Sequence, residues 1–170
     1  MSPSDESARL FLRQLVATLA YRAAKVLRDV PAGFGTTSFG DSTRQPVRIV
    51  AHMADLMSWG VSMARGEYTW KPEGSGDWDT EVQRFLANLH ALDAELAAAG
   101  EFRASVNQMI QGPLADALTH VGQLAMLRGM VKAPVRPESY AKADIMIGRV
   151  GFDQAAPRRE FDGDASVPRK

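Results

Sequence analysis

The sequence contains no cysteine among its 170 residues. Disulfide bonds, thiolate nucleophiles and zinc sites with cysteine ligands are therefore excluded. The chain also has no excess of charge of either sign, because 20 Lys and Arg residues balance 20 Asp and Glu residues. A chain without net charge has no global field that attracts nucleic acid or an anionic membrane. We therefore expect neither nucleic acid nor a membrane as a partner.

Long hydrophobic runs are missing as well. One of the longest, residues 15–21, is already interrupted by Thr18. A helix that spans a bilayer needs about 20 consecutive apolar residues. The first residues are polar and acidic, unlike the basic and then apolar start of a secretory signal. The expected location is cytoplasmic.

Hydrophobic residues make up 45% of the chain, which suits one domain with a sizeable core. Four segments repeat them at the three- and four-residue steps of amphipathic helices, and no segment shows a clear strand alternation. The segments are residues 5–29, 46–65, 79–99 and 113–131. The predicted fold is all-α, a four-helix bundle over residues 1–135. Residues 136–170 are expected to form an irregular C-terminal extension that packs on the bundle or is partly disordered.

Local signals predict where the four helices begin. The expected signals are Ser4 for the first helix, Ser42 or Thr43 for the second, the capping-box pair Thr80 and Gln83 for the third, and Pro113 for the fourth. The connector at residues 67–78 carries Trp70 and Trp78. Two tryptophans in a polar loop either line a binding pocket or cover the end of the bundle, and the second reading is favoured.

Three histidines, His52, His90 and His120, are candidates for chemistry. Asp116 lies four residues before His120, and positions four apart share one face of a helix. Carboxylate oxygen and imidazole nitrogen both bind divalent metals, and His52 on the second helix is available as a third ligand. From spacing alone, a hydrogen-bonded Asp–His pair facing solvent is the more frequent arrangement.

Two segments resemble helices of the DinB-like (DinB/YfiT-like) superfamily. Residues 112–124, GPLADALTHVGQL, followed by Arg128, resemble its last core helix, and residues 50–55, VAHMAD, resemble its second. The resemblance covers about residues 8–135. It implies a four-helix bundle, usually a homodimer, with a divalent metal held by one histidine of the second helix and a His-x-x-x-His pair of the last.

His52 and His120 match this pattern, whereas Asp116 replaces the first histidine of the pair. The resemblance therefore implies a metal site made of His52, Asp116 and His120. The exchange keeps a metal-binding group but changes its charge and hardness. Zinc or nickel is the expected metal, iron or manganese is the alternative, and a degenerate site stays open.

Other side chains near this motif have expected roles of their own. Gln123 and Thr119 are expected to orient His120 through its second ring nitrogen. Arg128 is expected either to pair with an anionic substrate group or to form a structural ion pair. No role follows for His90.

Characterised members of the superfamily include thiol-dependent S-transferases and isomerases. The resemblance implies a metal-dependent enzyme of this kind, with a low-molecular-weight thiol and a small-molecule substrate. The alternative is a non-catalytic, stress-associated dimeric binding module with a vestigial metal site. The ligand set also permits the chemistry of iron oxygenases with two histidines and one carboxylate.

Overall fold

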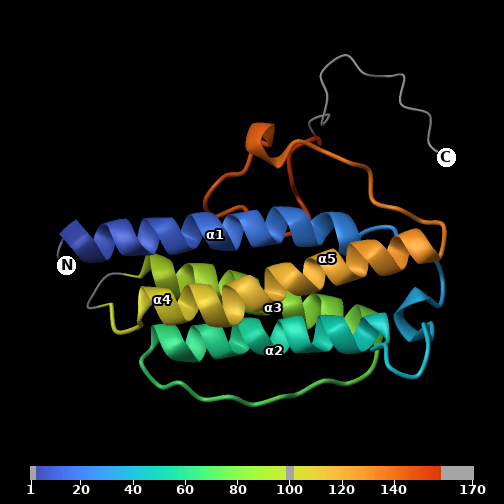
Figure 1. Cartoon of the computed structure of the whole chain (residues 1–170). Coiled ribbons are helices and arrows are strands. Elements are labelled where there is room, and N and C mark those ends of the chain that lie inside the picture. Colours follow the sequence, from blue (N-terminus) through green and yellow to red (C-terminus); the bar gives the residue numbers. More distant parts are fainter. Residues whose placement is uncertain (1–2, 99–101, 158–170) are drawn as a thin grey trace.

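The computed structural model describes residues 3–98 and 102–157, and it shows a bundle of helices (Figure 1). Its four long helices are α1 (Pro3–Leu27), α2 (Pro46–Ala64), α3 (Trp78–Ala97) and α5 (Ala115–Met130). The described ranges contain no strand. The predicted all-α four-helix bundle is therefore confirmed. Across the same residues, no helix has both the length and the apolar character needed to cross a membrane.

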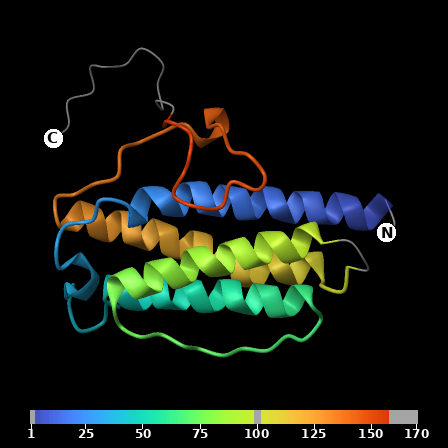
Figure 2. The same cartoon turned by 180° about the vertical axis from the view of Figure 1, so that it is seen from behind.

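The helices run in two directions (Figure 1). α1 and α5 run one way, and α2 and α3 run the other way. α2 packs against α3 and α5, and α1 packs against the same two helices. Because α2 and α3 are parallel neighbours, the chain between them must return along the bundle, and Figure 2 shows this connector following α2. The connector therefore lies over one flank of the bundle.

The core is built from the apolar stripes that the sequence predicts. Side chains spaced by three and four residues on each long helix point to a common interior. Fully buried examples are Leu12, Val16, Leu19, Met53, Met57, Phe85, Leu89, Leu92 and Leu124. Burial of these stripes positions the four helices and hence the side chains on their inner faces.

The predicted start of α2 at residue 46 is confirmed, whereas the predicted caps of α1 and α2 are wrong. α1 begins at Pro3, one residue before the expected cap Ser4, and proline suits a first helical turn. The residue before α2 is Gln45, so neither Ser42 nor Thr43 caps it. Proline at the first position of α2 lacks the N–H that a cap would satisfy, so the helix loses little without one.

The start of α3 also differs from the prediction. Asp77 caps the helix by accepting a hydrogen bond from the backbone N of Thr80 at 2.8 Å, so the expected Thr80–Gln83 capping box is wrong. This hydrogen bonding lowers the pKa of Asp77. Asp77 and Thr80 are both good capping residues. Because the cap is Asp77, three residues before Thr80, Trp78 becomes the first residue of the helix.

The last helical segment starts earlier than residue 113. A short helix α4 (Val106–Met109) leads into the π-helical turn η2 (Ile110–Leu114), and α5 follows directly. Pro113 lies inside this turn rather than opening the helix. Proline lacks an N–H and disrupts the normal helical pattern, and single π turns occur often at functional sites. The turn ends two residues before Asp116.

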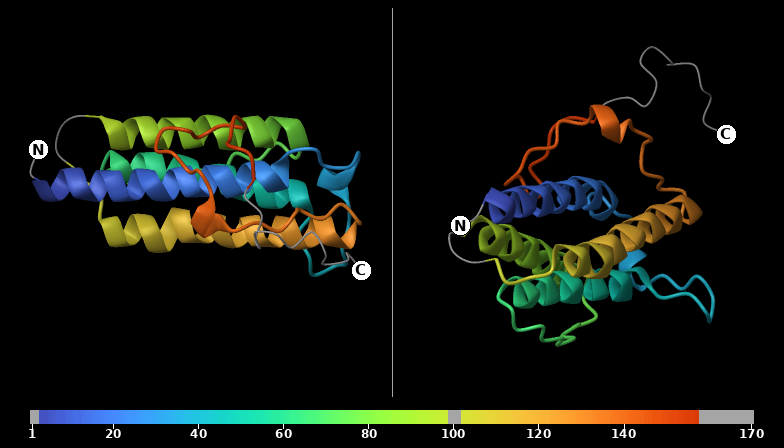
Figure 3. Two further views of the ribbon diagram at one scale, coloured as in Figure 1. Left: turned by 90° about the horizontal axis from the view of Figure 1, so that it is seen from above. Right: turned by 60° about the vertical axis from the view of Figure 1, so that its left-hand side comes forward.

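The described part of the C-terminal extension contacts α1, and it includes a short helix, η3 (Tyr140–Lys142). Glu138 accepts hydrogen bonds from the hydroxyl of Tyr21 and the ammonium group of Lys25. The Arg28 guanidinium donates to the carbonyl oxygen of Phe152. The left view of Figure 3 shows this segment lying across α1. Residues 158–170 of the expected extension lie outside the described part of the chain.

Candidate metal centre

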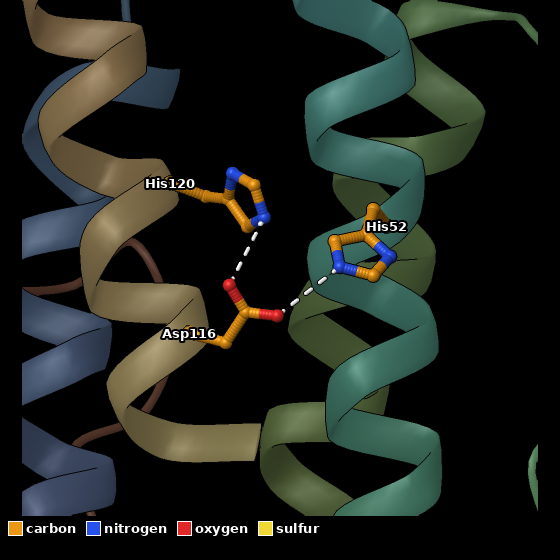
Figure 4. Close-up of side chains that lie close together, drawn as sticks. All are labelled: His52, Asp116 and His120. Atoms are coloured by element: carbon orange, nitrogen blue, oxygen red, sulfur yellow. Dashed lines mark hydrogen bonds and ion pairs between the residues drawn. The ribbon is translucent and has the colours of Figure 1, made fainter. Parts of the chain in front are cut away.

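The three predicted ligands come together between α2 and α5 (Figure 4). Nε2 of His52 lies 3.3 Å from Oδ2 of Asp116, and Nε2 of His120 lies 3.3 Å from Oδ1 of the same carboxylate. One ligand atom from each residue lies within 4.8 Å of the other two. The imidazole rings of His52 and His120 meet edge to face, with centroids 5.0 Å apart. The carboxylate therefore stands between two histidines of different helices.

Helix geometry explains how Asp116 and His120 share this point. They are four positions apart on α5, so their side chains leave the same face of the helix. His52 lies in the second turn of α2, whose neighbour in the bundle is α5. The packing of the two helices thus brings a residue 64 positions away to the Asp116 carboxylate.

Gln123 orients His120. Nδ1 of His120 lies 2.7 Å from Oε1 of Gln123. An amide oxygen only accepts hydrogen bonds, so Nδ1 of His120 donates in this contact and Nε2 is the ring nitrogen that faces Asp116. Such a bond from the second ring nitrogen is typical of metal-binding histidines. The predicted contact between Gln123 and His120 is present.

The donor set fits a divalent cation. An imidazole nitrogen faces a carboxylate oxygen at each of the two contacts, and a positive charge placed between them, such as a divalent cation, stabilises this arrangement. Ligand atoms around one tetrahedral ion with bonds of about 2.0–2.1 Å lie about 3.4 Å apart. The two separations of 3.3 Å involve different oxygens of Asp116, whereas one ligand atom from each of the three residues lies within 4.8 Å of the other two. The group of His52, Asp116 and His120 can therefore hold a metal ion.

The centre is open on one side. The His120 side chain is 9% exposed and the Asp116 side chain 44% exposed, so one ligand is anchored in the bundle and another faces solvent. A cavity of about 520 Å³ borders all three ligands. It is also lined by Ser42, Thr43, Arg44, Ile49, Gln123, Met126 and Leu127. This volume lies within the range of about 300–1,000 Å³ found for small-molecule sites.

The two tryptophans of the predicted connector, Trp70 and Trp78, have different positions. Trp70 lies against the centre, with its ring centroid 5.8 Å from that of His52, so it lines a pocket. Trp78 packs edge to face on Phe34 at the end of the bundle. The favoured prediction, that both cover the bundle end, is therefore wrong for Trp70 and correct for Trp78.

Thr119 and His90 do not take part in the metal centre. The hydroxyl of Thr119 donates to the carbonyl of Ala115 on its own helix, so its predicted role beside His120 is wrong. His90 is exposed on α3, a helix that supplies no ligand.

Arg128 has neither of its predicted roles. Its guanidinium donates to carbonyl oxygens at the end of α1, among them that of Arg28 at 2.6 Å, and to that of Ala133 at 2.9 Å. Burial lowers the pKa of Arg128, although the charge of Asp29 opposes this effect. The side chain ties the end of α1 to α5 and contacts no residue of the metal centre.

Some lining residues were missed by sequence reasoning. Trp59 follows His52 by seven positions, which is two helical turns on the same face of α2, so the spacing could have found it. Arg44 comes from the connector before α2 and carries no such pattern. Loop residues of this kind reach a site only through the path of the folded chain.

Comparison of the chain with models of protein families, with curated proteins and with solved structures finds no match. The resemblance to the DinB-like superfamily stays a prediction from two sequence segments. The geometry of the centre is therefore the evidence from which its function is inferred.

Proposed function

We propose that this protein is a divalent-metal-dependent enzyme that uses a low-molecular-weight thiol to modify or isomerise a small molecule. One observation carries the proposal. Two imidazoles and one carboxylate converge within 4.8 Å at the edge of a cavity of about 520 Å³. A metal bound by three protein ligands keeps open positions, as catalytic centres require.

His52, Asp116 and His120 would hold the ion, and zinc or nickel suits two imidazoles and one carboxylate. When bound, a divalent cation lowers the pKa of a thiol at the site and so supplies a nucleophile near neutral pH. Gln123 keeps His120 in the tautomer that presents Nε2. The partial exposure of Asp116 leaves a path for the thiol from solvent.

The cavity offers polar groups beside the ligands. Ser42, Thr43 and Arg44 line it, and the hydroxyls and the guanidinium can hold carboxylate or similar groups of a small thiol. Such contacts would orient the sulfur toward the metal ligands. The thiol of this proposal is therefore polar and anionic.

The proposed reaction needs no oxidant or reductant. The thiol loses its proton to water, and its sulfur forms a bond to an electrophilic carbon. In a transfer, the leaving group departs with the electron pair of the bond that breaks. In an isomerisation, the new sulfur–carbon bond breaks again and the thiol is released unchanged.

A dimeric binding module without catalysis is the second candidate. One observation favours it, since the apolar side chains of Leu10 and Phe11 on α1 are 48% and 52% exposed. The cavity at the metal ligands favours the enzyme instead. Sedimentation of the wild type and of Leu10→Glu tests whether this surface holds a dimer.

Thermal unfolding with metal and thiol tests the enzyme proposal. The probes are zinc, 2-mercaptoethanesulfonate, and isethionate, in which a hydroxyl replaces the thiol. Zinc at 100 times its Kd stabilises the folded state by about 2.7 kcal/mol, which raises the Tm by about 5–10 °C for a chain of this size. We expect the thiol to raise the Tm further only when zinc is present, and isethionate to add nothing.

The chain offers a matched control, because its third histidine lies outside the centre. We expect His120→Ala to lose the zinc-dependent shift and His90→Ala to keep it. An equal shift in both variants would overturn the site. A zinc shift without any further effect of the thiol would overturn the thiol chemistry and leave a metal-binding protein.

A further inference from the structure

A second cavity shares two residues with the metal centre. It has a volume of about 380 Å³ and is lined by His52 and Asp116 together with Leu56, Trp59, Tyr68 and Trp70. The last four side chains have no formal charge, and three of them are aromatic. A molecule in this cavity would therefore touch the metal ligands with one end and aromatic rings with the other.

The rings are arranged as the walls of a pocket. Trp59 and Trp70 stand edge to face, with centroids 5.8 Å apart and planes at 88°. Trp70 meets His52 in a similar way, at 5.8 Å and 66°. Aromatic groups prefer such edge-to-face contacts and offset stacking, so the pocket presents ring faces and edges that match another planar ring.

Two of the aromatic side chains that line the pocket are not buried in the hydrophobic core. Trp70 is 43% exposed and Tyr68 is 41% exposed, although both are large apolar side chains. The backbone of Tyr68 has φ +56°, in the left-handed region that a tyrosine rarely adopts. Backbone strain of this kind is often found at ligand sites. The Tyr68 hydroxyl is fixed by accepting a hydrogen bond from the backbone N of Ser105 at 3.3 Å.

The connector that carries Trp70 is fastened to α2 on both sides of this residue. The backbone N of Thr69 donates to the Ser62 hydroxyl at 2.8 Å, and that of Glu73 donates to Oδ1 of Asp55 at 3.1 Å. Gly74 comes so close to α2 that a Cβ there would lie 3.1 Å from Cβ of Ala51. The position of Trp70 is thus prepared before any ligand arrives.

A buried ion network secures the far side of the connector. The Glu81 carboxylate accepts a hydrogen bond from the backbone N of Ser75. Arg84 lies between Glu81 and Asp55 and pairs with both. Glu81 is fully buried, so its charge depends on these partners. The network holds two of the connector's backbone N–H groups through side chains of α2 and α3.

We propose that this cavity is the subsite for an aromatic ring of the electrophilic substrate, with Trp59 and Trp70 as its walls. The inference rests on the proposed function and adds the substrate class to it. A cationic ligand is disfavoured, because a divalent ion at His52 and Asp116 would repel it. The volume suits a small ring compound rather than a peptide.

Binding of two neutral probes tests the subsite. 2-Naphthol is aromatic and cyclohexanol is not, and both carry one hydroxyl group. We expect zinc-loaded wild type to bind 2-naphthol at least about tenfold more tightly than cyclohexanol. Trp70→Ala should lower the affinity for 2-naphthol about tenfold, and Trp70→Phe, which keeps a ring, should recover most of it. Isothermal titration and NMR shifts of the protein measure both affinities.

Phe11→Ala is the matched control, since Phe11 is an exposed ring on α1 outside the cavity. It should bind 2-naphthol as the wild type does. Three results would overturn the subsite: wild-type affinity of Trp70→Ala for 2-naphthol, equal affinity of the wild type for cyclohexanol and 2-naphthol, or no binding of 2-naphthol at all. If the wild type still binds zinc in these cases, the proposed function stands without the subsite. Absence of zinc uptake by the wild type would overturn the proposed function and the subsite with it.

Discussion

Nε2 of His52 and Oδ2 of Asp116 lie 3.3 Å apart, although 64 positions separate the two residues in the chain. The other carboxylate oxygen faces Nε2 of His120. Each oxygen of Asp116 is thus directed at a different histidine. This residue is also the one that departs from the three-histidine pattern that the predicted resemblance implies. Its charge is therefore the property of the centre to test first.

Asp116→Asn should lower zinc affinity by at least about tenfold. The amide keeps the size of the side chain but removes the negative charge, which attracts a divalent ion. Asp116→His should bind zinc more tightly than Asp116→Asn, because it supplies a third imidazole. Isothermal titration measures both. Asp144→Asn, in an exposed pair with Arg149 at 3.5 Å, is the control, and unchanged affinity in Asp116→Asn would contradict the assignment.

Gln123→Leu should weaken zinc binding by about 10–100-fold, the range found when the partner of a metal-binding histidine is removed. The leucine cannot accept the hydrogen bond from Nδ1 of His120, so the ring loses its fixed tautomer and orientation. Thr119→Val is the control from the same helix, because the Thr119 hydroxyl donates to the carbonyl of Ala115 one turn earlier and not to His120. Equal affinities for the two variants would show that Gln123 does not orient the ligand.

The sequence predicts the bundle well because burial is a property of many residues at once. Single errors in the stripes of α1 or α3 leave the pattern intact. Helix starts are less predictable, since Asp77 and Thr80 are both good caps and only the path of the preceding connector selects Asp77. The π turn around Pro113 was not predicted either, because proline normally marks the first turn of a helix and here it lies inside a helical segment.

Some residues of the candidate site could likewise be predicted from the sequence, and others could not. Helix spacing predicts only that Asp116 and His120 share one face of a helix. Their role as metal ligands, and the inclusion of His52, come from the predicted resemblance to a family. Trp70 lies beside His52 only because its connector is pinned at Ser62 and Asp55, two helix residues that carry no local signal for this role. Contacts of this kind depend on the returning path of the chain between two parallel helices.

Arg128→Ala should destabilise the fold by about 3 kcal/mol, because several carbonyl oxygens at the end of α1 lose a buried partner. For a chain of this length the Tm should fall by about 6–12 °C. Arg48→Ala, on the exposed side of α2, should change stability by less than about 0.5 kcal/mol. Denaturant unfolding gives both values. A small effect of Arg128→Ala would show that water replaces the guanidinium at these carbonyls.

Acid should release the connector through Glu81. Burial alone raises the pKa of Glu81, but hydrogen bonds from Ser75 and Arg84 and the charge of Arg84 outweigh it, so the pKa is lowered. A carboxyl with a lowered pKa stabilises the folded state above its unfolded pKa of about 4.3 and loses this contribution as pH falls through the folded pKa. Asp55 shares Arg84 and its charge also faces this network.

Glu81→Gln isolates this effect, since glutamine does not titrate. At pH 7 the variant should be less stable than the wild type by about 2 kcal/mol, the value of hydrogen bonds to a buried charge. The difference should shrink as pH falls below about 4.3, because the unfolded wild type then binds a proton at Glu81 that the folded state binds only at its lower pKa. Glu73→Gln, an exposed carboxylate of the same connector, should alter stability at pH 7 by less than about 0.5 kcal/mol. Unfolding free energies of wild type and Glu81→Gln that stay parallel from pH 7 to pH 3 would exclude Glu81 as the group that couples the connector to pH.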